Sequence, residues 1–110
     1  MNETVVLYAL PIRAGHEREV LNFAMGLGAN PDAAGAVADE GITVESVFVD
    51  QGPDGARLFV YQRIPDPEHA QRSLLASTNP VNVEMRHLME TALDAPVVYP
   101  LAFDYLSPGQ

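Results

Sequence analysis

The segments of this chain that are predicted to form strands carry apolar side chains on both faces. The clearest are residues 4–12, 56–64 and 97–106. A sheet with one face in water alternates apolar and polar residues, because only one of its faces meets the core. Helices packed on one side of such a sheet leave the other side uncovered. We therefore expect a second copy of the chain to cover that face, which makes the protein a homodimer.

Composition excludes several classes of function. The 110 residues fit one domain, which we place at residues 1–106, with 107–110 as a frayed tail. The formal net charge of −9 gives no support for binding nucleic acid. The chain has no cysteine and no lysine, which excludes disulfides, thiol nucleophiles and Schiff-base lysines. Without a signal-peptide pattern or a membrane-length apolar run, we expect a cytoplasmic protein that binds no membrane.

Local signals place helices between the strands. Residues 16–27 have helical spacing, and Gly41 is expected to stop a short, weak helix in the left-handed conformation. Three pairs read as a helix cap followed by proline at the first helical position: Asn30-Pro31, Asp66-Pro67 and Asn79-Pro80. A turn at residues 52–55 joins strands 42–50 and 56–64 into a hairpin. The order β-α-β-β-α-β predicts an α+β, ferredoxin-like fold with a four-stranded antiparallel sheet.

The helix after Asn79-Pro80 has the best-defined amphipathic pattern of the chain. Its apolar stripe predicts that Leu88 and Ala92 pack on the sheet together with Met85 and Met89. The polar stripe predicts that Arg86 stays in water.

Two short motifs carry the spacing of metal ligands, His16-x-x-Glu19 and Glu84-x-x-His87. A di-metal carboxylate site needs two Glu-x-x-His motifs on a helical bundle, and this chain has one in another fold class. We therefore interpret both as solvent-facing contacts one helical turn apart and predict no metal. Glycine-rich phosphate or dinucleotide motifs are absent from the sequence, so no cofactor is predicted either.

Polar and aromatic residues on the strands are the remaining candidates for a site. They are Tyr8, Glu45, Arg57, Tyr61, Arg63 and Tyr99. Alternation along residues 57–63 puts Phe59, Tyr61 and Arg63 on the dimer face, where we also place Tyr8. The opposite face, which includes Leu58, is expected to meet the helices.

Two interpretations of this set stay open. In the structural one, Glu45 and Arg63 form a cross-strand ion pair and the tyrosines pack around it. In the functional one, Arg63 binds a carboxylate, phenolate or enolate oxygen and Glu45 acts as the base. Tyr8, Tyr61 and Tyr99 then form the walls that contact the substrate.

With these residues placed, the chain resembles the dimeric α+β barrel superfamily over nearly its full length, and within it a group of small uncharacterised bacterial domains. The resemblance is carried by residues 7–15, by Gly-Ile-Thr-x-Glu at 41–45, by the turn at 53–55 and by Ser-x-x-Pro at 77–80. Two positions depart from the pattern. Ala14-Gly15 replaces the usual Pro-Gly, and Met85 stands where a histidine is often found. His87 lies about 200° further round the helix and does not replace that histidine.

The resemblance implies a homodimeric barrel that holds a small apolar or aromatic ligand. Members of the superfamily include cofactor-free monooxygenases, polyketide cyclases, lactone isomerases, haem-degrading enzymes and stress-associated proteins, and the fold does not choose among them. We expect a cofactor-free tailoring enzyme; the alternative is a non-catalytic structural or stress-associated dimer. A roomy cavity with an unpartnered acid or arginine favours the enzyme, and a filled barrel with every polar group paired favours the alternative.

Overall fold

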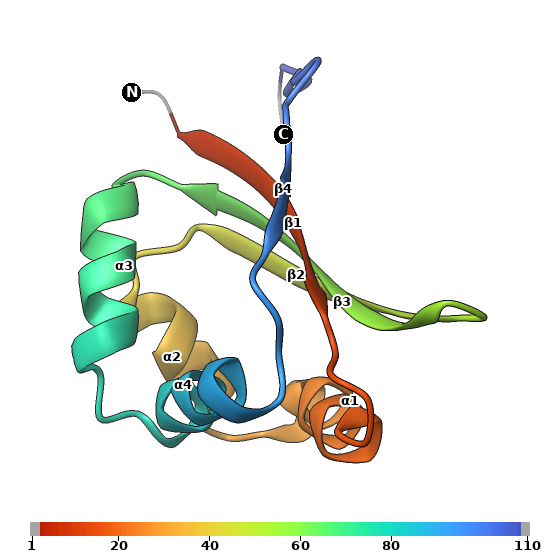
Figure 1. The fold of residues 1–110 in the computed structure, drawn as a ribbon. Coiled ribbons are helices and arrows are strands. Elements are labelled where there is room, and N and C mark those ends of the chain that lie inside the picture. The colour runs from red at the N-terminus through yellow and green to blue at the C-terminus, as the bar shows by residue number, and fades with distance from the viewer. Residues whose placement is uncertain (1–2, 109–110) are drawn as a thin grey trace.

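The computed structural model describes residues 3–108 and places four α-helices and four strands along them (Figure 1). The strands are β1 (Thr4–Pro11), β2 (Val44–Gly52), β3 (Gly55–Ile64) and β4 (Val97–Tyr99). The helices are α1 (Glu17–Gly26), α2 (Ala33–Asp39), α3 (Pro67–Ala76) and α4 (Pro80–Thr91), with a 3₁₀ turn at Leu27–Ala29 after α1. The expected order is confirmed, with α2 as the short extra helix and the second crossover divided into α3 and α4.

The strands form one antiparallel sheet in the order β2-β3-β1-β4. Each crossover connection returns the chain to the same side, so the helices gather on one face of the sheet and leave the other bare (Figure 1). This arrangement confirms the predicted α+β, ferredoxin-like fold.

Helix boundaries follow the predicted caps. The side chain of Asp66 accepts a hydrogen bond from the backbone N–H of His69, and that of Asn79 accepts one from Val81. The pair Asn30-Pro31 behaves differently. The side chain of Asn30 accepts a hydrogen bond from the backbone N–H of Asp32 in a turn, and α2 begins only at Ala33. Gly41 ends α2 in the left-handed conformation, with φ of +68°, as expected.

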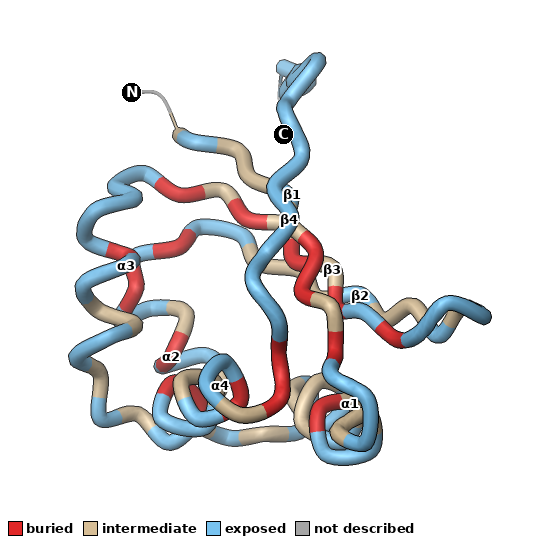
Figure 2. The backbone as a smooth tube through the Cα atoms, in the orientation of Figure 1, coloured by how far each residue is buried: buried red, intermediate tan, exposed pale blue. Residues whose placement is uncertain are grey.

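The core lies between the helices and the middle strands (Figure 2). Leu88 of α4 and Ala92, which directly follows α4, are fully buried, as the amphipathic pattern predicts. Met89 is 41% exposed, so the buried stripe of α4 is narrower than expected. The expectation for Arg86 is wrong, because its guanidinium donates to the carbonyl of Leu74 at 2.6 Å and ties α4 to the end of α3.

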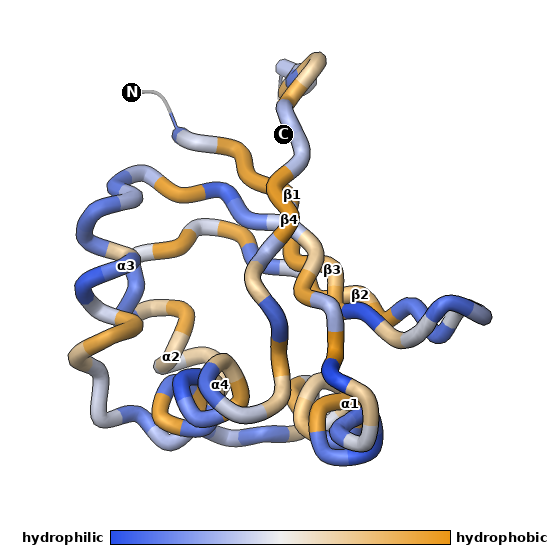
Figure 3. The backbone as a smooth tube through the Cα atoms, in the orientation of Figure 1, coloured by the Kyte–Doolittle hydropathy of each residue, from blue (hydrophilic) through white to orange (hydrophobic). Residues whose placement is uncertain are grey.

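The last strand is shorter than expected. Pairing with β1 ends at Tyr99, whereas the sequence predicts a strand to residue 106. Pro100 follows and has no N–H to continue the ladder, which gives the physical reason. The chain beyond it is exposed (Figure 2) and mixes hydrophilic with hydrophobic residues (Figure 3). Its exposed large hydrophobic side chains are Leu101, Phe103, Tyr105 and Leu106. The frayed tail expected at 107–110 falls partly outside the described residues.

Within residues 3–108, none of the helices combines the length and the apolar character needed to cross a membrane.

Candidate functional site

A cavity of about 860 Å³ lies between the helices and the sheet. Strands β1, β2 and β3 form its floor, α1 to α4 form its walls, and the connection from α4 to β4 borders it. Most of its lining is hydrophobic, including Leu10, Phe23, Val47, Val60, Leu74 and Met85. The buried hydrophobic residues correspondingly form two clusters, one around Leu88 and a smaller one around Ile64.

The predicted site residues are divided between the two faces of the sheet. Tyr8 lies opposite Val60, and Glu45 lies opposite Gln62, so both point toward the helices and line the cavity. Tyr61 is paired with Leu7, which in turn is paired with Tyr99.

Tyr61, Tyr99 and Arg63 therefore share the open face. Side chains on opposite faces of a sheet cannot bound one pocket, so the structure does not bring the five residues together.

Two expectations about individual residues are wrong. Tyr8 does not lie on the open face, where the sequence analysis placed it. Glu45 and Arg63 do not form an ion pair, because Arg63 stands opposite Val44 and binds the carboxylate of Asp104 at 2.5 Å. Glu45 instead accepts a hydrogen bond from the Gln62 side-chain amide at 2.5 Å.

Sequence reasoning missed Glu40, which follows the last residue of α2 and lines the cavity. It is only 9% exposed. Burial, reinforced by the charges of Glu45 and Asp39, raises the pKa of Glu40 to about 7. A signal was present: an acid at a helix C-terminus opposes the helix dipole, so Glu40 occupies a place that local energetics disfavour.

Tyr8 is affected by the same acids. Burial, followed by the charges of Glu45 and Glu40, raises the pKa of the Tyr8 phenol well above its usual value. The phenol therefore stays protonated at neutral pH and presents a donor to the cavity.

Two buried amides also line the cavity. Gln62 is 7% exposed and uses its N–H to bind Glu45. Asn82 of α4 is 3% exposed and donates to the carbonyl of Ala36 at 3.4 Å. Each amide thus uses one of its two N–H donors for a protein contact, while its oxygen remains available as an acceptor toward the cavity that both residues line.

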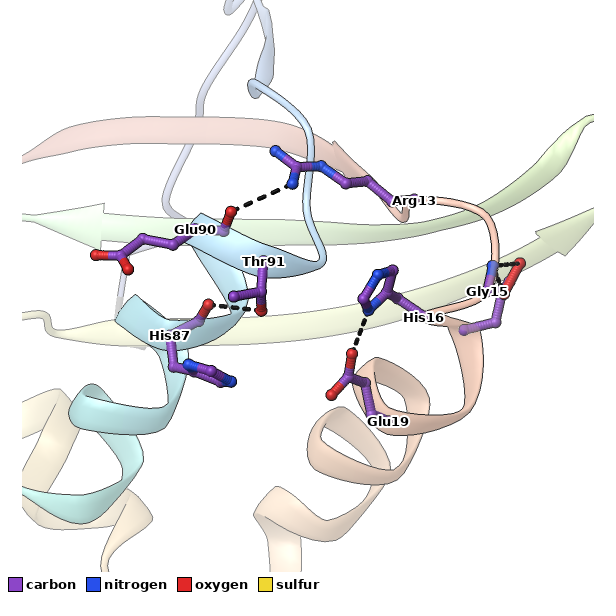
Figure 4. A network of polar contacts seen from close by, with 8 residues as sticks. Arg13, Gly15, His16, Glu19, His87, Glu90 and Thr91 are labelled. Carbon is purple, nitrogen blue, oxygen red and sulfur yellow. Dashed lines mark hydrogen bonds and ion pairs between the residues drawn. The ribbon is translucent and has the colours of Figure 1, made fainter.

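Arg13 is the cationic side chain among the described lining residues. Its Nε donates to Asp94 at 3.1 Å, and its Nη1 donates to the carbonyl of Glu90 at 3.2 Å. Figure 4 shows Arg13 reaching from the end of β1 to α4. This guanidinium is already bound to the protein.

The two spacing motifs form different contacts. His16 and Glu19 contact one another on α1, whereas the backbone carbonyl of His87 accepts a hydrogen bond from Thr91 (Figure 4). Within residues 3–108, no three metal-ligating side chains come together.

The open face forms a second candidate surface. The register aligns Phe48, Phe59, Ala9 and Val97 in one row across the sheet. Phe48 is 59% exposed and Val97 is 49% exposed. Arg57 stacks over the ring of Phe59 at 5.1 Å from its centroid, which is a cation–π contact.

Comparison with known proteins adds a family and a fold. The structure is similar to the crystal structure of PA3566 from Pseudomonas aeruginosa, with 13% identity and a TM-score of 0.62, covering 93% of this chain and 97% of that one. It is also similar to the structure of Rv0793 from Mycobacterium tuberculosis, with 14% identity and a TM-score of 0.58, covering 94% and 97%. No curated protein matches the sequence. A family model matches residues 3–104, nearly the whole chain, and the protein belongs to that family, described as a family of unknown function (DUF6176).

Proposed function

We propose that the protein binds a small, mostly apolar molecule in the cavity between its sheet and its helices. The observation that carries this proposal is the cavity itself. Its volume of about 860 Å³ lies within the range of about 300–1,000 Å³ that is typical of small-molecule sites. Its walls are hydrophobic, with a few polar groups grouped on the inner side. Protein interiors are otherwise close-packed, so a space of this size favours an occupant.

The same site supports cofactor-free chemistry on the bound molecule, of the monooxygenase, cyclase or isomerase type. A general base works best when its pKa lies near the working pH, and the pKa of Glu40 is about 7. Tyr8 supplies a protonated phenol beside it. We assign Glu40 and Glu45 as candidate proton acceptors and Tyr8 as a hydrogen-bond donor to the substrate.

We further propose that the protein is a homodimer through its open sheet face, as in dimeric α+β barrels. The face is apolar along the row of Phe48, Phe59 and Val97, and none of the helices in residues 3–108 covers it (Figure 1). Monomeric proteins rarely expose continuous apolar patches of this kind. Tyr61, Arg63 and Tyr99 are assigned to this interface and not to the ligand site.

A non-catalytic structural dimer is the alternative function. It is favoured by the open face, where the charged groups pair with each other. Arg57 binds Asp50 at 2.7 Å, and Arg63 binds Asp104 at 2.5 Å. The cavity favours the first proposal, because the acid of Glu40 has no partner in the hydrogen bonds and ion pairs of the described residues.

Binding can be tested by NMR titration with 1-naphthalenemethanol, a neutral probe small enough for the cavity. We expect shifts at cavity-lining residues of both the sheet and the helices. Val47→Phe, which projects a larger side chain into the cavity from the floor, should weaken binding and reduce these shifts. The matched control is Val83→Phe on α4, because Val83 is 45% exposed and does not line the cavity. Equal binding by wild type and Val47→Phe would contradict the proposed site.

Assembly can be tested by sedimentation at micromolar concentration. We expect a dimer for the wild type and dissociation for Phe48→Asp, which places a charge on the apolar row. Thr78→Asp changes an exposed residue away from the sheet and should leave the dimer intact. A folded wild-type monomer under these conditions would refute the proposed interface.

A further inference from the structure

The inner side of the cavity presents acceptor oxygens. The carboxyl groups of Glu40 and Glu45 lie there, together with the amides of Gln62 and Asn82. Both amides have already spent an N–H on a protein acceptor. Each amide keeps a second N–H, and the phenol of Tyr8 is a further donor. In the hydrogen bonds of residues 3–108, however, the Glu40 carboxyl and the Asn82 amide oxygen receive no donor from the protein. A ligand that satisfies this set must therefore bring hydrogen-bond donors of its own.

Asn82 and Glu40 are the two groups that most clearly lack a protein partner. Asn82 is 3% exposed and Glu40 is 9% exposed, yet no hydrogen bond of residues 3–108 uses the Asn82 amide oxygen or the Glu40 carboxyl. In the described part of the chain, no completely enclosed side-chain polar atom is left unpaired. The unpaired oxygens of both residues therefore retain some accessible surface, and we infer that this surface faces the cavity that the residues line.

The charge of this inner side is not compensated by a nearby cation. Of the described residues that line the cavity, Arg13 carries a permanent positive charge, and Asp94 and the carbonyl of Glu90 bind its guanidinium. The charge of Glu45 acts on both Tyr8 and Glu40 and raises the pKa of each. Two carboxyls that repel each other in a partly buried space attract a positive group.

We propose that the molecule held in this cavity carries a basic amine on an apolar body, and that its ammonium group binds between Glu40 and Glu45. This inference rests on the proposed small-molecule site. An anionic ligand is repelled by the two carboxyls, and a purely apolar one leaves the acceptor oxygens without donors. The site does not offer enough ligands for a metal ion, since residues 3–108 hold no group of three metal-ligating side chains.

Binding of the amine should depend on pH. Below pH 7 the carboxyl of Glu40 carries a proton, which must leave before the ammonium gains a full charge partner. The other titratable groups facing Glu40 are Tyr8 from β1, Glu45 from β2 and Asp39 from α2, since α4 contributes the neutral Asn82. From α3, His69 approaches this end of α2 through the carbonyl of Asp39. Affinity for an amine should therefore rise between pH 6 and pH 8.

The test compares three probes that share one ring system: 1-naphthylmethylamine, 1-naphthalenemethanol and 1-naphthaleneacetate. Affinities for the full chain are measured by NMR titration at pH 6 and pH 8. We expect the amine to bind at least about tenfold more tightly than the alcohol at pH 8, and the acetate more weakly than both. Glu40→Gln should lower amine affinity about tenfold and leave the alcohol unchanged. Glu84→Gln, an exposed glutamate outside the cavity, is the control.

The outcomes separate this inference from the proposed function. If wild type binds amine and alcohol equally at both pH values, the cavity is a ligand site without the preference for an amine, and the inference fails alone. If none of the probes binds, the proposed small-molecule function fails with it. Should Glu40→Gln not fold, the ratio of amine to alcohol affinity in wild type, with its change between pH 6 and pH 8, decides the question.

Discussion

The difference in unfolding free energy between Glu40→Gln and wild type should change with pH. It should shift in favour of Glu40→Gln as the pH rises. Burial and neighbouring acids raise the pKa of Glu40 from the model-compound value of 4.5 to about 7. Between these pH values the folded protein holds a proton that the unfolded chain has released. The stability of wild type therefore falls as pH rises through this window.

The magnitude follows from the two pKa values. A difference of about 2.5 between them corresponds to at most about 3.4 kcal/mol, at 1.36 kcal/mol for each pH unit. The carboxyl opens onto a cavity that solvent reaches, which screens the charge. We therefore expect the unfolding free energy of Glu40→Gln, relative to that of wild type, to be about 1–2 kcal/mol higher at pH 8 than at pH 5.

The assay is urea unfolding of wild type and Glu40→Gln at pH 5 and pH 8. Protein concentration is held fixed, because a dimer's apparent stability depends on it. Glu84→Gln, on the exposed side of α4, should show no such difference between the two pH values. A stability difference between wild type and Glu40→Gln that is the same at both pH values would refute the buried, high-pKa carboxyl.

Three further substitutions, with Val83→Ala as a control, test the packing and the ends of the helices by urea titration. Leu88→Ala removes a fully buried side chain and should cost about 2–5 kcal/mol, whereas Val83→Ala on the same helix should stay within about 0.5 kcal/mol. Arg86→Ala should cost about 1 kcal/mol, because the carbonyl of Leu74 loses a hydrogen bond of 2.6 Å; no measurable loss would make that contact unimportant. Gly41→Ala should cost about 1–2 kcal/mol, since φ is +68° there, and an unchanged midpoint would contradict this backbone conformation.

The fold was predictable because its signals are local. Proline after a capping residue starts α3 and α4, a left-handed glycine ends α2, and the turn at 52–55 joins β2 to β3. Each of these signals acts within a few residues, so the nearby sequence is sufficient to predict where the element begins or ends. The order of elements that results is compatible with few topologies.

The division of the site between two faces was only partly predictable. A two-residue turn pairs Gly52 with Gly55 and thereby places Glu45 opposite Gln62, so counting from the turn excludes an ion pair with Arg63. The orientation of Tyr8 follows from the pairing of β1 with β3, which no local turn fixes. Because β1 carries apolar residues on both faces, hydrophobicity does not indicate which face meets the helices either. Glu40 was missed because its burial depends on how α2 packs.

The alternation of β2 allows the ligand site and the interface to be tested with two adjacent residues. Val47 points into the cavity and Phe48 lies on the open face, although one peptide bond joins them. Val47→Phe should therefore weaken binding of 1-naphthalenemethanol and leave the dimer intact. Phe48→Asp should dissociate the dimer, while any folded monomer keeps its cavity and still binds the probe. If Val47→Phe dissociates the dimer and Phe48→Asp abolishes binding, the functions assigned to the two faces are reversed.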